Sequence, residues 1–221
     1  MADKAVIFDM DGVLVDSYEA HFESWRRMAQ ARGLDPMSQD MFAKTFGRTT
    51  WDIITDRWPR IAKEEIPSLD DQKEATFREI LTEHFPEMPG ASELLACLHK
   101  AGFALAIGSS GPPANVQVIL KQLRNADLFA ATVDASQVRL GKPNPDVFLT
   151  AAGKLGVKPA RCVVVEDAPA GVQAARAAGM SVIARVGTVT RDRLASADLV
   201  VDSLREITPQ VVDGLITVRR T

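Results

Sequence analysis

The feature that most constrains the fold is a set of short apolar runs that recur along the chain without alternating with polar residues. The runs are AVIF (5–8), FALAI (103–107), CVVV (162–165), SVIA (181–184) and DLVV (198–201). Strands that are buried on both faces have this pattern, because neither face can be polar. Segments with helical spacing lie between the runs, at 91–100, 113–123, 145–155 and 170–178. This alternation predicts an α/β fold with a doubly wound parallel sheet.

The segment 16–86 has a different pattern. It contains no strand-like run, and its apolar residues recur at helical spacing, as in SYEAHFESWRRMAQARG and DDQKEATFREILTEHF. Roughly 70 residues without a strand is long for a connection inside a sheet. We therefore predict two domains, an α/β core formed by 1–15 and 87–221 and an inserted α-helical cap domain formed by 16–86.

Charge and composition limit the partners of the protein. The 221 residues include 26 Lys and Arg against 29 Asp and Glu, a net charge of −3, and neither sign forms a long block. This balance gives no electrostatic support for nucleic acid or an anionic membrane as a partner. We expect a monomer or a weak dimer.

The chain also lacks the marks of export. No apolar run reaches the roughly 18 residues of a membrane span, and the start MADKAVIFD reaches an acid too early for a secretory signal. Cys97 and Cys162 have apolar neighbours and form no CxxC pattern, so we expect both to be reduced core residues. A cytoplasmic location fits these features best.

Residues that can carry chemistry directly follow three of the apolar runs. Asp9 and Asp11 follow the first run, the turn 108–111 (GSSG) follows the second, and Glu166 with Asp167 follows CVVV. Lys142 lies before the last of these, in RLGKPNPDVF. Because ligands of open α/β sheets bind at the carboxyl ends of the strands, we expect these side chains to converge at one edge.

The residue types at this edge suit a metal and a phosphate. Asp9, Asp11 and Asp167 offer the few carboxylates that Mg²⁺ prefers while it keeps water and phosphate oxygens. Ser109, with Ser110 and the N–H groups of the same turn, can donate hydrogen bonds to phosphate oxygens, and Lys142 can offset their charge.

The two acids of the first motif can divide the chemistry between them. A carboxylate beside a metal can attack a phosphoryl group and form an acyl phosphate, and Asp9 is the best candidate for this nucleophile. Asp11 lies two residues further on, where it can face the same site. It can protonate the leaving oxygen and later deprotonate water, provided that neighbouring charge raises its pKa.

Each motif alone also has a simpler interpretation. DMDG is then an aspartate-rich turn, GSSG and the Lys-Pro loop are surface turns, and the acids of VVVED cap the next helix. The conjunction of all four, in chain order and at element boundaries, favours the functional interpretation.

The four segments FDMDGVLVDS, IGSSG, GKPNPDVF and VVVEDAPAGVQAARAAGM resemble the successive motifs of the haloacid dehalogenase-like (HAD) hydrolase superfamily. The similarity spans nearly the whole chain and is strongest to the branch of β-phosphoglucomutase and phosphoglycolate phosphatase-like enzymes, which carry a helical cap after the first motif. The resemblance implies a Rossmann-like core, Asp9 as nucleophile, Asp11 as acid and base, and Ser109 and Lys142 as phosphate binders. It implies Mg²⁺ ligands from Asp9, the main-chain carbonyl of Asp11, Asp167 and Glu166.

The activity implied by the resemblance is phosphoryl transfer, because the position of Asp11 need not be an acid in a dehalogenase. We expect a Mg²⁺-dependent phosphatase that acts on a small phosphorylated metabolite such as a sugar phosphate, through an aspartyl phosphate. A sugar phosphomutase similar to β-phosphoglucomutase is the first alternative. The second is a non-catalytic signalling module that keeps its aspartyl phosphate, although an acid at Asp11 and a cap suit turnover better.

Within the cap, five residues are candidates for substrate contact. Ser17 and His21 lie four residues apart in SYEAHFESW, which resembles the corresponding mutase helix, and Lys73 aligns with a cap lysine of the branch. Gly47 and Arg48 belong to TFGRTTWDII. His21 as a polar helix residue and Lys73 as a solvated lysine are the simpler interpretations.

One departure from the mutase pattern favours the phosphatase. A mutase-like chain would have a base before Gly47 and an arginine three residues after it, where this chain has Phe46 and Thr50. A bisphosphorylated intermediate needs such cations to hold its second phosphate.

Other enzyme classes lack their motifs here. A serine hydrolase needs GxSxG and a later histidine, but all three histidines precede Ser109. The dinucleotide motif GxGxxG and the P-loop motif GxxxxGK[ST] are also absent.

Overall fold

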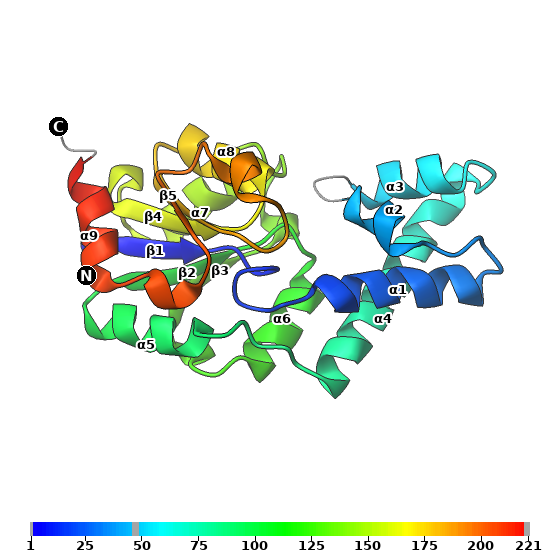
Figure 1. Ribbon diagram of the computed structural model, residues 1–221, viewed down its shortest axis with the longest axis horizontal. Coiled ribbons are helices and arrows are strands. Elements are labelled where there is room, and N and C mark those ends of the chain that lie inside the picture. The colour runs from blue at the N-terminus through cyan, green and yellow to red at the C-terminus, as the bar shows by residue number, and fades with distance from the viewer. Residues whose placement is uncertain (1, 46–48, 219–221) are drawn as a thin grey trace. The chain divides into compact units, whose positions relative to one another are not determined.

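The computed structural model describes residues 2–45 and 49–218 of the chain. The chain forms two compact units, Met1–Asp16 with Glu87–Thr221 and Ser17–Pro86 (Figure 1). We refer to them as the α/β unit and the helical unit.

The α/β unit is built on one parallel sheet of six strands in the order β3-β2-β1-β4-β5-β6. The strands are β1 (Ala5–Phe8), β2 (Ala104–Gly108), β3 (Phe129–Val133), β4 (Cys162–Glu166), β5 (Ser181–Arg185) and β6 (Leu199–Val201). This order is that of a doubly wound sheet, in which the direction of winding reverses at the central strand. The predicted fold class is therefore confirmed, with β1 at the switch point.

Helices cover both faces of this sheet. They are α5 (Ala91–Lys100), α6 (Pro113–Gln122), α7 (Asp146–Leu155), α8 (Pro169–Ala177) and α9 (Pro209–Val218), with 3₁₀ turns η2 (Ala126–Leu128), η3 (Ala135–Gln137), η4 (Pro159–Arg161), η5 (Arg191–Leu194) and η6 (Leu204–Glu206). Ile7, Ala106 and Val164 pack in one apolar cluster with side chains of α7 and α8. Figure 1 shows α8 and α5 on opposite sides of the sheet. All four residues of β1 are fully buried, as their unbroken apolar pattern requires.

The edge strand β3 has no counterpart among the predicted strands. The five apolar runs correspond to the other five strands, whereas FAATV of β3 is mostly half-buried and includes the exposed Ala130. An edge strand pairs on one side only and is less enclosed, so it does not need a continuous run of bulky apolar residues.

The prediction for the two cysteines is half wrong. Cys162 is buried at the start of β4, but Cys97 is exposed on α5. The buried face of α5 is formed by Ala91, Leu94, Leu95 and Leu98, which follow the 3.6-residue period of a helix. Cys97 falls outside that stripe although its sequence neighbours are apolar.

The chain leaves the α/β unit and returns to it at two neighbouring points of that unit. Val15 forms an antiparallel bridge with Glu87, and the Met88 N–H donates to the carbonyl of Leu14 at 3.0 Å. The backbone on either side of the insertion is therefore hydrogen-bonded together within the α/β unit.

The helical unit contains only helices and loops in its described ranges. These are α1 (Tyr18–Ala31), α2 (Gln39–Ala43), α3 (Thr50–Arg57), η1 (Lys63–Glu65) and α4 (Ile66–Glu83). Its core includes Trp25, Met28 and Ile54, all nearly inaccessible to solvent. Ser38 and Thr49 begin α2 and α3 by accepting hydrogen bonds from Met41 and Asp52 N–H groups. Neither α4 nor any other helix of the described residues is long and apolar enough to cross a membrane.

Candidate active site

The structure brings four of the predicted site residues together at the carboxyl edge of the sheet. Asp9 follows β1 directly, Glu166 ends β4 and Asp167 follows it. Since β1 and β4 are adjacent, with Phe8 opposite Val165, these acids are neighbours across the sheet. Lys142 reaches them from the loop before α7: its Nζ donates to Asp9 Oδ1 at 2.5 Å and to Glu166 Oε1 at 2.7 Å.

Three carboxylates meet closely enough to share a cation. One oxygen each from Asp9, Glu166 and Asp167 lies within 4.8 Å of the others. A cluster of hard carboxylate oxygens fits Mg²⁺ by ligand chemistry. Glu166 accepts more hydrogen bonds than the other two, because its Oε2 also accepts from the main-chain N–H groups of Asp167 and Ala168, both at 2.8 Å.

The site carries more negative charge than its lysine balances. Burial raises the pKa of the Asp9 carboxyl to about 7, and the carboxylates of Glu166 and Asp11 add to this rise while Lys142 opposes it. Burial, followed by the charges of Glu166 and Asp9, raises the pKa of Asp167 well above its ordinary value. Such shifts mark a place where a divalent cation would be stabilised, since it would neutralise the unbalanced carboxylates.

Asp11 lies in a tight turn beside the three acids. The Met10 carbonyl accepts main-chain hydrogen bonds from Val13, Leu14 and Val15, and the Gly12 N–H donates to the Val15 carbonyl at 2.8 Å. Gly12 has a φ of +72°, and a Cβ at this position would overlap the Asp167 carboxylate. The turn thus needs glycine both for its conformation and for its closeness to Asp167.

The turn after β2 also lies at this edge. Ser109 is 1% exposed, and its Oγ accepts the Gly111 N–H at 2.9 Å, which leaves the hydroxyl hydrogen to donate elsewhere. Ser110 is exposed. The turn leads directly into α6, and the positive end of that helix dipole suits an anion.

The carboxyl end of β3 holds an acid that the sequence reasoning missed. Asp134 is 6% exposed and accepts hydrogen bonds from Ser136 N–H, Ser136 Oγ and Gln137 Nε2 at 2.5 to 2.9 Å. Burial alone would raise the pKa of the Asp134 carboxyl, but these hydrogen bonds outweigh burial and lower it. The next residue, Ala135, donates its N–H to the Gly111 carbonyl at 3.1 Å. Asp134 therefore orders the loop that supports the Ser109 turn.

Two further residues come from the end of β5 and the loop after it. Thr188 Oγ1 donates a hydrogen bond to Asp167 Oδ2, and Arg185 Nη1 donates to the Gly12 carbonyl at 2.9 Å. The segment ARVGTVT contains no acid and no recognisable motif, so only its place after an apolar run could have drawn attention to it.

Three of the predicted cap residues lie in the described part of the helical unit, and two of them meet. Lys73 Nζ lies 2.9 Å from His21 Nδ1 and donates to Glu74 Oε1 at 2.7 Å. The His21 ring stacks on Phe77 with centroids 4.0 Å apart. Lys73 is 4% exposed and belongs to the buried stripe of α4, so its interpretation as a solvated lysine is wrong.

The remaining cap candidates are Ser17, Gly47 and Arg48. Ser17 is buried at the start of α1, where its carbonyl accepts the His21 N–H. Gly47 and Arg48 lie outside the described residues.

Gly171 on α8 gives a test of how tightly Glu166 is held. A Cβ at Gly171 would overlap the Glu166 carboxylate, so Gly171→Ala is expected to lower the free energy of unfolding by about 3 kcal/mol or more. The measurement is urea unfolding followed by circular dichroism. Gly153→Ala on α7 is the matched control, since a Cβ there meets nothing within 4 Å and should stabilise the helix by up to about 1 kcal/mol. Equal behaviour of the two variants would contradict the packing.

Fold and site together define a class: a doubly wound α/β protein with a carboxylate–lysine centre at the switch point of its sheet. The family model of the haloacid dehalogenase-like hydrolases matches residues 4–179, and the chain belongs to this family. The resemblance of the four motifs is thereby confirmed, and the protein is an enzyme of a hydrolase family.

Relatives of known name match over almost the full chain. Hexitol phosphatase A of Escherichia coli (strain K12) is 39% identical over 214 residues, which are 94% of each chain. Beta-phosphoglucomutase of Bacillus subtilis (strain 168) is 34% identical over 217 residues, which are 95% of this chain and 93% of that one. Among solved structures, CbbY from Rhodobacter sphaeroides in complex with phosphate has a TM-score of 0.86 and 26% identity, covering 96% of this chain and 100% of that one.

Proposed function

We propose that the protein is a Mg²⁺-dependent phosphatase that hydrolyses a small phosphorylated carbohydrate through an aspartyl phosphate on Asp9. The observation that carries this proposal is the meeting of Lys142 with Asp9, Glu166 and Asp167 at the switch point of the sheet. Hexitol phosphatase A, the relative with 39% identity, supports the class of substrate.

Asp9 is the proposed nucleophile. It directly follows a fully buried strand, and the bond from Lys142 to Oδ1 fixes its carboxylate. A carboxylate oxygen of Asp9 attacks phosphorus, and the bond between phosphorus and the ester oxygen breaks. Asp11 donates its proton to the leaving oxygen, so the alcohol departs neutral.

The second step reverses the role of Asp11. Its carboxylate takes a proton from a water molecule as that water attacks the phosphorus of the aspartyl phosphate. The bond from phosphorus to Asp9 breaks, inorganic phosphate leaves, and both acids return to their starting states. Ser109, Ser110 and Lys142 hold the phosphate oxygens throughout, by hydrogen bonds and by charge.

Asp9, Asp167 and the Asp11 carbonyl are the proposed Mg²⁺ ligands, with Glu166 beside them. When bound, Mg²⁺ would neutralise the repulsion between the carboxylates and the incoming phosphate. Glu166 has a second role in this proposal, because its two engaged oxygens orient Lys142 and the start of α8.

We propose that the helical unit supplies the residues that select the substrate, with His21 and Lys73 foremost and Ser17, Gly47 and Arg48 as further candidates. The charge of Lys73 is already paired with Glu74 at 2.7 Å. A paired lysine is a weak site for a second phosphate but a good hydrogen-bond donor to a hydroxyl group. This pairing favours a sugar or polyol monophosphate, and so a phosphatase over a phosphomutase.

The test is product analysis with the purified protein and Mg²⁺. We expect release of inorganic phosphate from at least one member of a panel of hexitol and hexose phosphates, and loss of release when Mg²⁺ is chelated. Glucose 1-phosphate with a catalytic amount of glucose bisphosphate separates the alternatives. Glucose 6-phosphate formed in preference to free phosphate would establish the mutase, and a long-lived phosphoprotein without turnover would establish the signalling module.

A cytoplasmic location, a monomeric or weakly dimeric state and the lack of nucleic-acid or membrane partners stay predictions. Cell fractionation and analytical ultracentrifugation test the first two, and binding assays with DNA and anionic vesicles test the third.

A further inference from the structure

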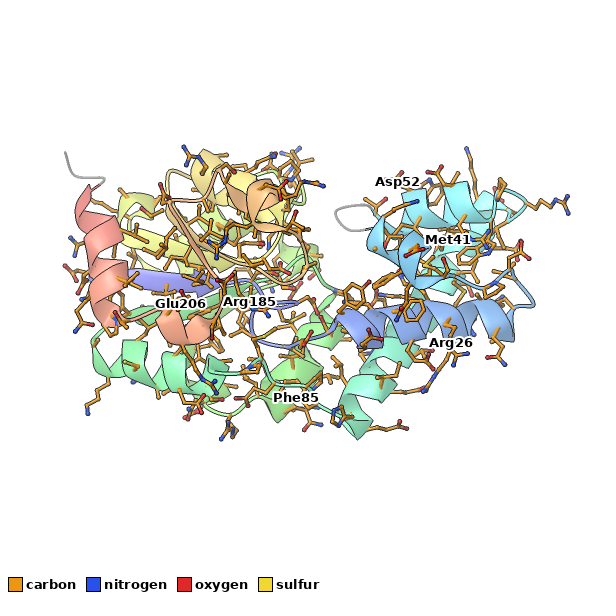
Figure 2. The ribbon with its side chains drawn as sticks, in the orientation of Figure 1. Arg26, Met41, Asp52, Phe85, Arg185 and Glu206 are labelled. Atoms are coloured by element: carbon orange, nitrogen blue, oxygen red, sulfur yellow. The ribbon has the colours of Figure 1, made fainter. Side chains whose placement is uncertain are left out.

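The segment 185–188, at the end of β5, contacts two separate parts of the proposed active site. Arg185, labelled in Figure 2, is the last residue of β5 and donates from Nη1 to the Gly12 carbonyl at 2.9 Å. Thr188 donates from Oγ1 to Asp167 Oδ2. One short segment thus binds the turn that carries Asp11 and the carboxylate of Asp167.

The packing among these groups is close. A Cβ at Gly12 would overlap the Asp167 carboxylate and would also lie 2.9 Å from Thr188 Oγ1, so both side chains occupy space that only glycine leaves open. The Arg185 guanidinium folds back against Gly187. A Cβ at Gly187 would lie within 3 Å of three guanidinium atoms. Gly187 therefore leaves the space in which Arg185 reaches Gly12.

Each hydrogen bond fixes a group that the proposed reaction uses. Thr188 donates to one oxygen of Asp167, Oδ2, and so fixes the plane of the carboxylate whose other oxygen, Oδ1, is available to a metal. Outer-shell partners of this kind commonly set ligand orientation and metal affinity. Arg185 holds the carbonyl next to Asp11 and so fixes the backbone from which the proposed acid projects, and small displacements of such a group slow the chemistry strongly.

We propose that Arg185 and Thr188 are positioning residues with separate roles. Arg185 positions the turn that carries Asp11, and Thr188 positions the Asp167 carboxylate so that one of its oxygens faces the metal. This inference rests on the proposed function, since it assigns roles within the same site. Neither residue contacts the reacting atoms in this assignment, and each acts through the group to which it donates.

The separation of duties gives the test. Thr188→Val keeps the shape of the side chain and removes the hydroxyl, so the Mg²⁺ dissociation constant, measured by calorimetry without substrate, should rise by about 10- to 100-fold. Thr188→Ser should restore it. Arg185→Met should leave Mg²⁺ affinity within about twofold and lower kcat by about 10- to 100-fold at nearly constant KM.

A direct readout of the turn accompanies the kinetics. In Arg185→Met, amide hydrogen exchange of the peptide that contains 11–15 should quicken, whereas in Thr188→Val it should stay close to that of the unchanged protein. Arg191→Met is the matched control, because Arg191 is exposed on η5, bonds the Val200 carbonyl and Asp202, and should leave all three measurements unchanged.

Three results would overturn the inference. The first is unchanged Mg²⁺ affinity in Thr188→Val, and the second is unchanged amide exchange of 11–15 in Arg185→Met. The third is an equal loss of Mg²⁺ affinity and of kcat in both variants, because general destabilisation would give that outcome. If the unchanged protein released no phosphate from any ester, the proposed function would fail. Calorimetry and amide exchange would still test whether Thr188 positions Asp167 and whether Arg185 positions the turn.

Discussion

Asp9→Asn is expected to abolish phosphate release, with kcat falling by roughly 10⁴-fold or more. An amide oxygen carries no charge and cannot form the aspartyl phosphate, although asparagine has nearly the same shape as aspartate. Phosphate release measured with saturating substrate and Mg²⁺ checks the loss. Labelled phosphate from a labelled ester should mark the unchanged protein in rapid-quench experiments and should not mark the variant.

Asp9→Asn is expected to stabilise the metal-free protein against unfolding, although it abolishes the activity. The pKa of Asp9 is about 7 in the folded protein and near 3.8 in an unfolded chain. The folded state therefore binds more protons than the unfolded state between these values, and this group makes the protein less stable as pH rises through that window. Asp9→Asn removes the buried charge, so thermal unfolding in a chelator at pH 8 should occur at a higher temperature than in the unchanged protein.

Asp11→Asn is the matched comparison for Asp9→Asn. It lies two residues away, is half-buried, and is expected to keep Mg²⁺ binding while losing about 10²- to 10⁴-fold in kcat. Turnover by Asp9→Asn within tenfold of the unchanged protein, or full activity in Asp11→Asn, would contradict the proposed division of labour.

Lys142→Met is expected to destabilise the metal-free protein by about 3 to 5 kcal/mol, because it leaves Asp9 and Glu166 buried without their cation. The midpoint of thermal unfolding in a chelator should fall by about 6 °C or more at pH 8. Lys142 lowers the pKa of Asp9, so the variant takes up the Asp9 proton at a higher pH than the unchanged protein does. The loss should therefore shrink as pH falls from 8 towards 7 and change little below that, where Asp9 is protonated in both proteins. Phosphate release should also fall steeply, because Lys142 is a proposed phosphate binder.

Lys121→Met controls for the loss of a lysine as such. Lys121 is exposed in the last turn of α6, and its removal should shift the unfolding midpoint by little. Equal shifts in the two variants at pH 8, or a pH-independent shift in Lys142→Met, would show that the buried charges do not depend on Lys142.

The sheet and the centre of the site could be predicted from sequence because buried parallel strands leave a direct pattern. A run such as AVIF must be apolar on both faces, and the residue that follows it must lie at the carboxyl edge, so position already places Asp9 and Glu166 at that edge and the conjunction of motifs assigns them a role. The edge strand β3 has no such requirement and was missed. Cys97 shows the reverse error, where apolar neighbours along the chain suggested burial that the helical period does not give.

The residues that support the site could not be predicted, because their roles depend on contacts distant in sequence. Arg185 bonds a carbonyl 173 residues away. A lone arginine or threonine in a loop has no pattern that separates this role from a solvated one. Lys73 was ambiguous for the same reason, since only the packing of α4 shows that it lies in the buried stripe.

The hydrogen-bonded closure at Val15 and Glu87 bears on how such enzymes diversify. Because the two ends of the insertion meet in the α/β unit, the length of the insertion enters the folding of its host mainly through loop closure, which costs only about 0.6 kcal/mol more for each doubling of length. Residues 17–86 can therefore be replaced over evolutionary time by longer, shorter or differently folded insertions without reworking the sheet. Relatives named for different substrates would then share one set of catalytic residues and differ mainly in an exchangeable module, and grafting that module between them is a practical route to new specificities.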